Sequence, residues 1–210
     1  MKQVADIEDF PVDFQECVRF HGHVCPGLAI GYAAVKAGAR VLGVTSSADE
    51  EIVAVVENNS CAVDAVQVLL GCTFGKGNLV FRDWGKQVMT FVDRASGRSV
   101  RVSLIGEIPG RARRHELREK MASGRASDAD TRLFEQLRFE TVKELIEGEP
   151  ERFFDVREVR LPMPPLSERV GTRPCDRCRE PVVTTRLIER EGTLLCAECA
   201  ADFNEKVSST

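Results

Sequence analysis

Residues 20–31, FHGHVCPGLAIG, concentrate the metal-binding and proton-handling side chains of this sequence, including two of its three histidines. In an extended segment alternate side chains project to the same side, so His21, His23 and Cys25 would form a tripod of two imidazoles and one thiol. Three protein ligands leave one coordination position of a zinc ion open, as catalysis or ligand exchange requires. We therefore predict a transition-metal site here, with zinc favoured and iron or nickel also compatible with these donors.

Cys25 stands immediately before Pro26, a residue that suits the first turn of a helix because no N–H is needed there. Cys25 would then occupy the N-cap, where exposed backbone N–H groups and the helix dipole stabilise a thiolate. We predict a lowered pKa for this thiol and a role as nucleophile or metal ligand, whereas Cys17 is expected to be an inert core thiol. An apolar stripe predicts the helix that follows and ends at Gly43: Leu28, Tyr32, Val35, Ala39 and Leu42.

Two further cysteines flank a second predicted helix, CAVDAVQVLLG. Ser60 can cap this helix at its start, and Gly71 closes it. Cys61 opens the helix and Cys72 follows it. Either thiol could complete or flank the metal tripod.

Three polar side chains on or after this helix are candidates for supporting roles. Asp64 and Gln67 lie one turn apart and could orient an imidazole or a bound water, although a first-turn acid such as Asp64 is often only solvated. Lys76, in the glycine-rich run CTFGKGNL, could be a substrate clamp, a proton donor or a plain loop lysine. Taken singly, His21 or His23 would be read as a hydrogen-bonded core or capping residue, but the pair beside an N-cap cysteine favours function.

A second cysteine-rich stretch has the spacing of a structural zinc site. Two C-x2-C pairs lie 17 residues apart and supply four thiolates, which leave no open position: Cys175, Cys178, Cys196 and Cys199. The interval predicts a β-hairpin turning at Glu191-Gly192, and the second pair begins a short helix, as in a treble clef or zinc ribbon. Free thiols or a redox pair are the alternative, which we disfavour because so small a core needs a metal to fold.

The charge of this finger argues against nucleic acid as its partner. Residues 167–210 carry seven Lys and Arg against eight Asp and Glu. The whole chain has a formal charge of -4, so it also lacks the basic surplus that neutralises phosphates. We expect the finger to contact protein or to stabilise a dimer.

Composition places the chain among globular proteins with one main domain and a small appendage. Its 210 residues are 43% hydrophobic and 30% charged. The N-terminal residues MKQVADIEDF contain no apolar run that resembles a signal peptide or membrane span, so a cytoplasmic protein is expected. Eight cysteines in such a protein indicate metal ligation or thiol chemistry before disulfides.

The rest of the sequence predicts a β-sheet, with helices both before and after its strands along the chain. Strands are expected at 51–57, 79–83, 87–93, 99–105 and 153–161, and helices at 10–20 and within 109–148. The strands at 87–93 and 99–105 are joined across RASGR as a hairpin. A basic cluster in the later helical region is interpreted as a solvated face: Arg111, Arg113, Arg114, Arg118 and Lys120. A proline-rich stretch then separates a core, 1–161, from the finger, 171–210, through a linker at 162–170.

Three ordered motifs, FHGHVCPGLAIGY, CAVDAVQVLLGCTFGKGNL and DWGK, resemble the signature of the FmdE family, which is named after a component of formylmethanofuran dehydrogenase. The resemblance covers residues 10 to about 161, and the finger resembles an additional C-terminal module of some members. It implies an α+β core with a mixed or antiparallel sheet packed with helices, an intertwined homodimer and possible membership of a larger redox complex. It also implies a pocket onto which seven residues map: His21, His23, Cys25, Cys61, Asp64, Cys72 and Lys76.

Two functions stay open on this evidence. One is an oxidoreductase subunit or accessory in one-carbon or redox metabolism, with Cys25, Asp64 and Lys76 as catalytic candidates. The other is a non-catalytic metal-binding or adaptor protein whose finger docks a partner. The ferredoxin pattern C-x2-C-x2-C-x3-C is absent from the sequence, so no iron–sulfur electron carrier of that kind is expected.

Overall fold

The computed structural model describes residues 7–166 and 170–207 and divides the chain into two compact units, Met1–Leu166 and Ser167–Thr210. The division falls inside the proline-rich linker expected at 162–170, of which residues 167–169 lie outside the described part. We call the two units the core and the finger and describe each by itself.

The core is built on one five-stranded sheet with the order β2-β1-β3-β4-β5. Its strands are β1 (Ile52–Val56), β2 (Leu79–Phe81), β3 (Val88–Asp93), β4 (Ser99–Leu104) and β5 (Phe154–Val159). β2 pairs parallel with β1, and all other neighbours are antiparallel, with β3 and β4 forming the predicted hairpin. The sheet is therefore mixed, and the α+β prediction is confirmed.

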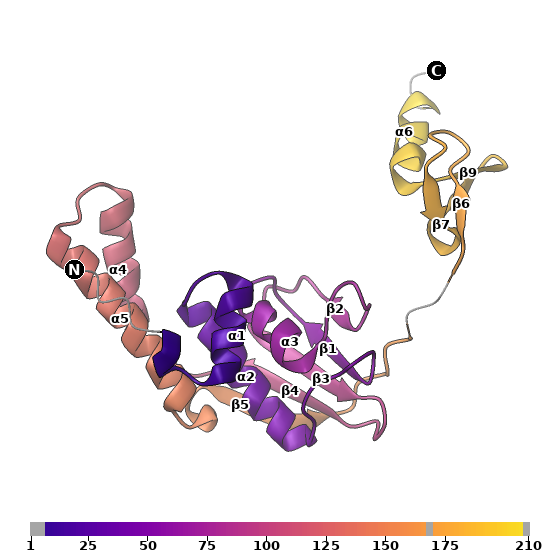
Figure 1. Ribbon diagram of the computed structural model, residues 1–210. Coiled ribbons are helices and arrows are strands. Elements are labelled where there is room, and N and C mark those ends of the chain that lie inside the picture. The colour runs from indigo at the N-terminus through magenta and orange to yellow at the C-terminus, as the bar shows by residue number, and fades with distance from the viewer. Residues whose placement is uncertain (1–6, 167–169, 208–210) are drawn as a thin grey trace. The chain divides into compact units, whose positions relative to one another are not determined.

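Helices pack on the face of the sheet that carries the apolar core, with α2 and α3 in direct contact with its strands (Figure 1). The helices of the core are α1 (Val12–His21), α2 (Pro26–Leu42), α3 (Ala62–Leu70), α4 (Arg111–Ala122) and α5 (Asp128–Glu147). Alternate strand residues such as Ala54, Phe91 and Val102 point into this core, as the period of two requires. α2 approaches the sheet closely, because a Cβ on Gly38 would lie 2.5 Å from the Phe91 ring.

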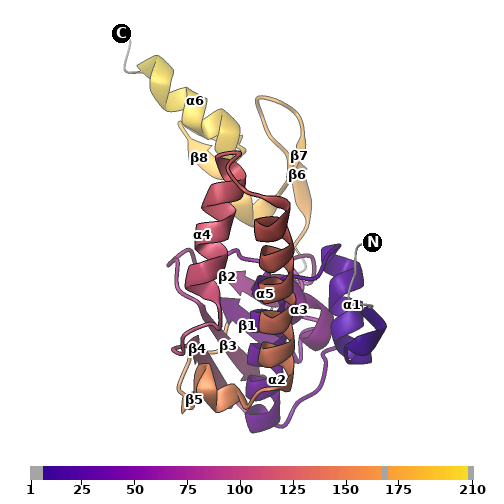
Figure 2. The same cartoon turned by 90° about the vertical axis from the view of Figure 1, so that its left-hand side faces the viewer.

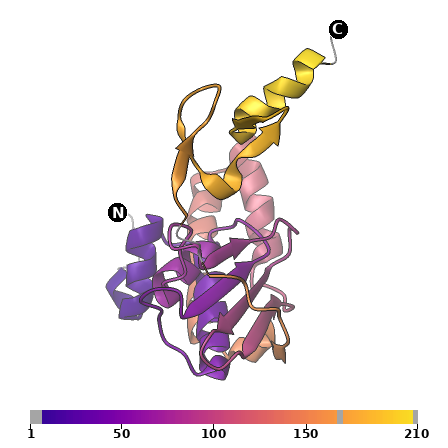
Figure 3. The same ribbon diagram turned by 90° about the vertical axis from the view of Figure 1, so that its right-hand side faces the viewer.

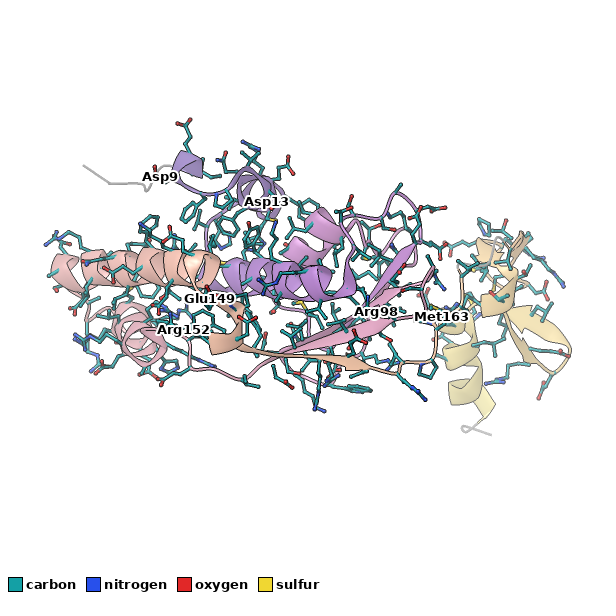
Figure 4. The ribbon with its side chains drawn as sticks, turned by 90° about the horizontal axis from the view of Figure 1, so that it is seen from below. Asp9, Asp13, Arg98, Glu149, Arg152 and Met163 are labelled. Atoms are coloured by element: carbon teal, nitrogen blue, oxygen red, sulfur yellow. The ribbon has the colours of Figure 1, made fainter. Side chains whose placement is uncertain are left out.

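α1 is attached to α2 by one carboxylate and by aromatic packing. Asp13, labelled in Figure 4, accepts hydrogen bonds from the Tyr32 hydroxyl at 2.9 Å and the Lys36 ammonium at 2.8 Å. The Phe14 ring packs edge-on against the Tyr32 ring with centroids 5.2 Å apart. These contacts hold the first turn of α1 against the middle of α2.

α4 and α5 form a helical hairpin, and α5 also packs against α2 (Figure 2). Ser127 and Asp130 make a reciprocal capping box that starts α5. The interpretation of the basic cluster as solvated was wrong for Arg114, which is buried and donates to the Pro109 carbonyl and the Thr141 hydroxyl. Within the described residues, no helix is long and apolar enough to span a membrane.

α2 and α3 pack so closely that only glycine fits on the facing side of α2. A Cβ on Gly31 would lie 2.1 Å from the Ala62 carbonyl oxygen, and a Cβ on Gly27 would lie 3.1 Å from the Cys61 Cβ. Real side-chain atoms do not approach a backbone oxygen this closely. The two glycines, four residues apart on one helix face, therefore bring the first turns of α2 and α3 into direct contact.

The finger contains two short hairpins and a helix (Figure 3). Its elements are β6 (Thr172–Pro174), β7 (Pro181–Val183), β8 (Ile188–Arg190), β9 (Thr193–Leu195) and α6 (Ala197–Val207). The predicted turn at Glu191-Gly192 is confirmed, since both residues adopt positive φ, 49° and 76°, between β8 and β9. Short 3-10 helices occur at Ile7–Asp9, Pro150–Arg152 and Thr184–Arg186.

The close packing of α2 on α3 makes a stability prediction. Gly31→Ala should destabilise the core by about 1–3 kcal/mol, because its methyl group overlaps the Ala62 backbone unless the helices separate. Gly75→Ala is the matched control: no atom lies within 4 Å of its Cβ position, so it should change stability by no more than about 0.5 kcal/mol. Urea unfolding followed by circular dichroism measures both, and equal stabilities would contradict the packing described.

Candidate metal centre

The tripod predicted from alternate spacing is assembled in a different way from the one expected. His21 is the last residue of α1, and Gly22 then turns the chain through a left-handed conformation with φ of 95°. The segment is therefore not extended. The prediction that its alternate side chains project to one side of a strand was wrong. The ligand atoms of His21, His23 and Cys25 nevertheless all lie within 4.8 Å of one another, because a helix end, a glycine turn and a helix start converge.

The distance between the first and third ligands suits a single metal ion. His21 Nε2 lies 3.6 Å from Cys25 Sγ. Two such donors bound to one tetrahedral zinc ion, at bond lengths of about 2.0 and 2.3 Å, are about 3.5 Å apart. This pair of donors fits zinc without rearrangement.

Asp64 orients the His21 imidazole from the other side. Its Oδ2 lies 2.7 Å from His21 Nδ1, and the Gln67 amide donates to its Oδ1 at 3.3 Å. A carboxylate on Nδ1 holds the proton there and leaves the lone pair of Nε2 directed at Cys25. The same carboxylate–imidazole arrangement supports metal-binding histidines and histidines that act as bases toward a thiol.

His23 is exposed, and its ring lies 4.5 Å from that of His21. Partial burial is the main cause that lowers the pKa of the His23 imidazole, and the nearby His21 ring and Arg138 guanidinium lower it further. A neutral ring keeps a nitrogen lone pair available for a metal. Arg138 belongs to α5, more than a hundred residues along the chain, and no local pattern in the sequence indicated its approach.

Cys25 is the N-cap of α2, as predicted, and its sulfur accepts a hydrogen bond from the Leu28 N–H at 3.4 Å. The predicted low pKa is wrong for the metal-free thiol. Burial raises the pKa of Cys25 above its usual value, and the neighbouring Cys61 thiol adds to the increase, so the Leu28 N–H is outweighed. Coordination by a metal cation has the opposite effect, because it deprotonates a thiol directly.

Cys61 is the thiol that flanks the tripod. It occupies the N-cap of α3, and its Sγ lies 3.6 Å from the Cβ position of Gly27, while Cys25 Sγ lies 3.8 Å from the same point. Ser60 does not cap the helix, contrary to expectation, since its hydroxyl donates to the Asn58 side chain at 2.6 Å. The packing of α2 on α3 thus places both thiols close to the Cβ position of Gly27.

Cys72 and Lys76 follow the end of α3 that is opposite Cys61. A helix of this length separates its two ends by about 15 Å. The Cys72 thiol is fully buried, donates to the Ile52 carbonyl, and has its pKa raised to about 12 by burial. The Lys76 ammonium donates to the carbonyls of Ser47 and Ala48 at 3.2 and 3.3 Å. The structure therefore groups neither residue with the tripod.

Asn58, which lies just after β1, was not among the residues that the sequence singled out. It is buried, its amide donates to the Lys86 carbonyl at 2.6 Å, and its carbonyl oxygen accepts from the Ser60 N–H at 3.0 Å. These bonds join the DWGK turn to the loop that leads into Cys61. A polar residue directly after a buried strand was the available signal.

The finger gathers four thiols into a second possible metal centre. The sulfurs of Cys175, Cys178, Cys196 and Cys199 all lie within 4.8 Å of one another. Cys178 Sγ and Cys196 Sγ are 4.0 Å apart, close to the spacing of about 3.8 Å for two thiolates on one tetrahedral zinc ion. The Cys196 N–H donates to Cys175 Sγ at 3.3 Å and is the main cause that lowers the pKa of Cys175 to about 6. The four cysteines would fill all four positions of a tetrahedral metal ion, which suits a structural site.

Comparisons with known proteins place these features in a family. A family model described as "FmdE, Molybdenum formylmethanofuran dehydrogenase operon" matches residues 20–155. The chain is 32% identical over 195 residues to a probable S-adenosyl-L-methionine-binding protein of Archaeoglobus fulgidus, covering 88% of this chain and 51% of the relative. It thus spans about half the length of that curated relative. It also resembles the crystal structure of an FmdE-like protein, related to tungsten formylmethanofuran dehydrogenase, from Syntrophus aciditrophicus, with 25% identity and a TM-score of 0.58 over 93% of this chain and 92% of that one.

The role of Asp64 can be tested by a change that keeps its shape. Asp64→Asn removes the charge that holds the proton on His21 Nδ1, so metal affinity at the core should fall about 10- to 100-fold. Asp128→Asn, the same replacement at an exposed position in the first turn of α5, should leave that affinity unchanged. Zinc titration against a competing chelator measures both, and equal affinities would show that Asp64 does not support a ligand.

A second prediction concerns the finger. Cys196→Ser should release one metal ion per chain and unfold residues 171–207, because metal binding supplies most of the stability of so small a module. Elemental analysis and limited proteolysis provide the measurements. A variant that keeps its full metal content and a protease-resistant finger would contradict the assignment of a four-cysteine metal site.

Proposed function

The chain belongs to the FmdE family, and on that premise we propose that it is a metal-binding protein of one-carbon and redox metabolism. His21, His23 and Cys25 hold a zinc ion with one position open, and the finger holds a structural zinc ion. The observation that carries the proposal is the alignment of Asp64, His21 and Cys25, with 2.7 Å between Oδ2 and Nδ1 and 3.6 Å between Nε2 and Sγ.

The donor set defines what the core site can do. Bound through three protein ligands, zinc supplies a Lewis acid that can polarise an oxygen ligand or lower the pKa of a bound water to about 7. Asp64 keeps the His21 ring in the tautomer that presents Nε2, and the start of α2 holds the Cys25 sulfur opposite it. The exposed His23 ring leaves this site accessible from solvent.

The family description supports the metabolic part of the proposal, since it refers to a molybdenum formylmethanofuran dehydrogenase operon. We propose that the chain acts as a subunit or accessory of such an oxidoreductase and works as a homodimer. Because the chain spans only about half of the S-adenosyl-L-methionine-binding relative, we assign no binding of that ligand to it. All eight cysteines are free thiols, which suits a reducing compartment and supports a cytoplasmic location.

A second candidate function uses the same residues without a metal. With its proton on Nδ1, His21 can accept the proton of the Cys25 thiol through Nε2, which is the arrangement of a cysteine nucleophile with its base and orienting acid. In this alternative Cys25 attacks an electrophilic carbon of the substrate. A third role, docking of a partner by the finger, is supported by its being a compact unit separate from the core.

Metal content per chain tests the proposed function. Wild-type protein purified without oxygen should carry two transition-metal ions per chain, and His23→Ala should weaken binding of one of them at least tenfold because a ligand is lost. His115→Ala is the matched control, since that histidine is exposed on α4 and remote in sequence from either cluster.

The finger zinc provides an internal reference in each sample. A single metal ion per chain in the wild type, or a His23→Ala variant that binds two ions as tightly as wild type, would contradict the open core site. Strong alkylation of Cys25 in protein that holds no core metal would then favour the second candidate function, in which Cys25 is a nucleophile. Light scattering should give twice the chain mass of 23.3 kDa for the proposed dimer.

A further inference from the structure

We propose that Cys25 and Cys61 form a reversible thiol–disulfide couple, and that closing the disulfide removes Cys25 from the core metal. The couple itself depends only on the two thiols and their surroundings. Its effect on the metal rests on the proposed function.

The geometry that carries the proposal is set by the glycine contact between α2 and α3. Both sulfurs lie within 4 Å of one point, the Cβ position of Gly27, with Cys61 Sγ at 3.6 Å and Cys25 Sγ at 3.8 Å. Each cysteine is an N-cap, so each side chain leaves the backbone where its helix has only begun. Because both distances are measured from one point, the sulfurs lie no more than 7.4 Å apart, and rotation about each χ1 can shorten that separation.

Cys25 and Cys61 differ from the other two cysteines of the core in their access to solvent. Cys25 and Cys61 are half-buried, whereas Cys17 and Cys72 are completely buried. A small oxidant can reach the first pair only.

The surroundings of Cys25 suit it to be the attacking thiol. His21 Nε2, 3.6 Å from the sulfur, can take the thiol proton while Asp64 stabilises the charge that the ring acquires. Cys61, whose sulfur lies near the same point beside Gly27, is then the resolving thiol.

The co-reactant is the disulfide of a small thiol. Cys25 attacks one sulfur of that disulfide, a protein–small-molecule disulfide forms, and the first small thiol leaves with the proton held by His21. The Cys61 thiol then attacks Cys25 Sγ, the Cys25–Cys61 bond forms, and a second small thiol leaves with the proton of Cys61. Two protein thiols have lost two electrons and two protons, and one small disulfide has become two thiols.

Metal binding and the disulfide exclude each other because both use the same sulfur. A disulfide sulfur is no longer a thiolate and is a poor zinc ligand. Conversely, a thiolate bound to zinc has its lone pair engaged and reacts more slowly with a disulfide. The core site would then release its metal under oxidising conditions and regain it on reduction.

The test uses the full chain carrying one or two zinc ions, with oxidised glutathione as the probe. The closed four-cysteine site should take the first ion and the open core site the second. Digestion with trypsin and a protease that cleaves before aspartate places the four core cysteines on four different peptides. Mass spectrometry of blocked, unreduced peptides then identifies a Cys25–Cys61 cross-link directly.

In protein with one zinc ion we expect the Cys25–Cys61 cross-link, reversed by dithiothreitol. Cys61→Ser should instead trap glutathione on Cys25, because the resolving thiol is gone. Cys72→Ser, the matched control at the other end of α3, should cross-link as wild type does. Protein with two zinc ions should cross-link at least tenfold more slowly.

The outcomes separate this inference from the proposed function. Absence of the Cys25–Cys61 peptide in protein with one zinc ion would overturn the couple. Equal rates with one and two ions would overturn the exclusion of metal by the disulfide. Failure of the chain to take up a second ion would contradict the proposed core site instead, and the cross-link in protein with one ion would still decide the couple.

Discussion

The close packing of α2 on α3 at Gly27 and Gly31 is the constraint on which the core site depends. A methyl group at Gly31 would overlap the Ala62 carbonyl, so the two helices can meet only because this face of α2 carries no side chain. The first turns of both helices then lie together, and Cys25, Cys61 and Asp64 converge on the end of α1. A small separation of α2 from α3 would move Cys61 away from Cys25, because each of these cysteines begins one of the two helices.

The imidazole of His21 connects the chemistry of this site. One of its nitrogens is held by Asp64 and the other faces Cys25. The same orientation suits His21 both to bind a cation through Nε2 and, without one, to accept the proton of the thiol. In our proposal, metal binding and thiol chemistry are competing states of one set of side chains, and a bound metal would keep the accessible thiol from reacting.

Local sequence signals predicted the parts of the structure that local physics decides. Pro26 placed Cys25 at the N-cap, the run RASGR joined β3 to β4, and the cysteine spacing located the finger hairpin. Tertiary contacts decided the rest. Spacing could not choose between Cys61 and Cys72, because that choice depends on which end of α3 meets α2. The pKa of Cys25 was predicted in the wrong direction, since burial beside a second thiol outweighs one N–H hydrogen bond. The approach of Arg138 and the burial of Arg114 likewise come from how α5 folds back.

The most direct test of this account is a crystal structure of the zinc-loaded chain with anomalous scattering measured on both sides of the zinc absorption edge. The account predicts two peaks, one surrounded by the four finger sulfurs and one bonded to His21 Nε2, His23 and Cys25 Sγ, with Asp64 still on His21 Nδ1. A single peak in the finger, or a core ion that binds His21 through Nδ1 in place of Asp64, would contradict it.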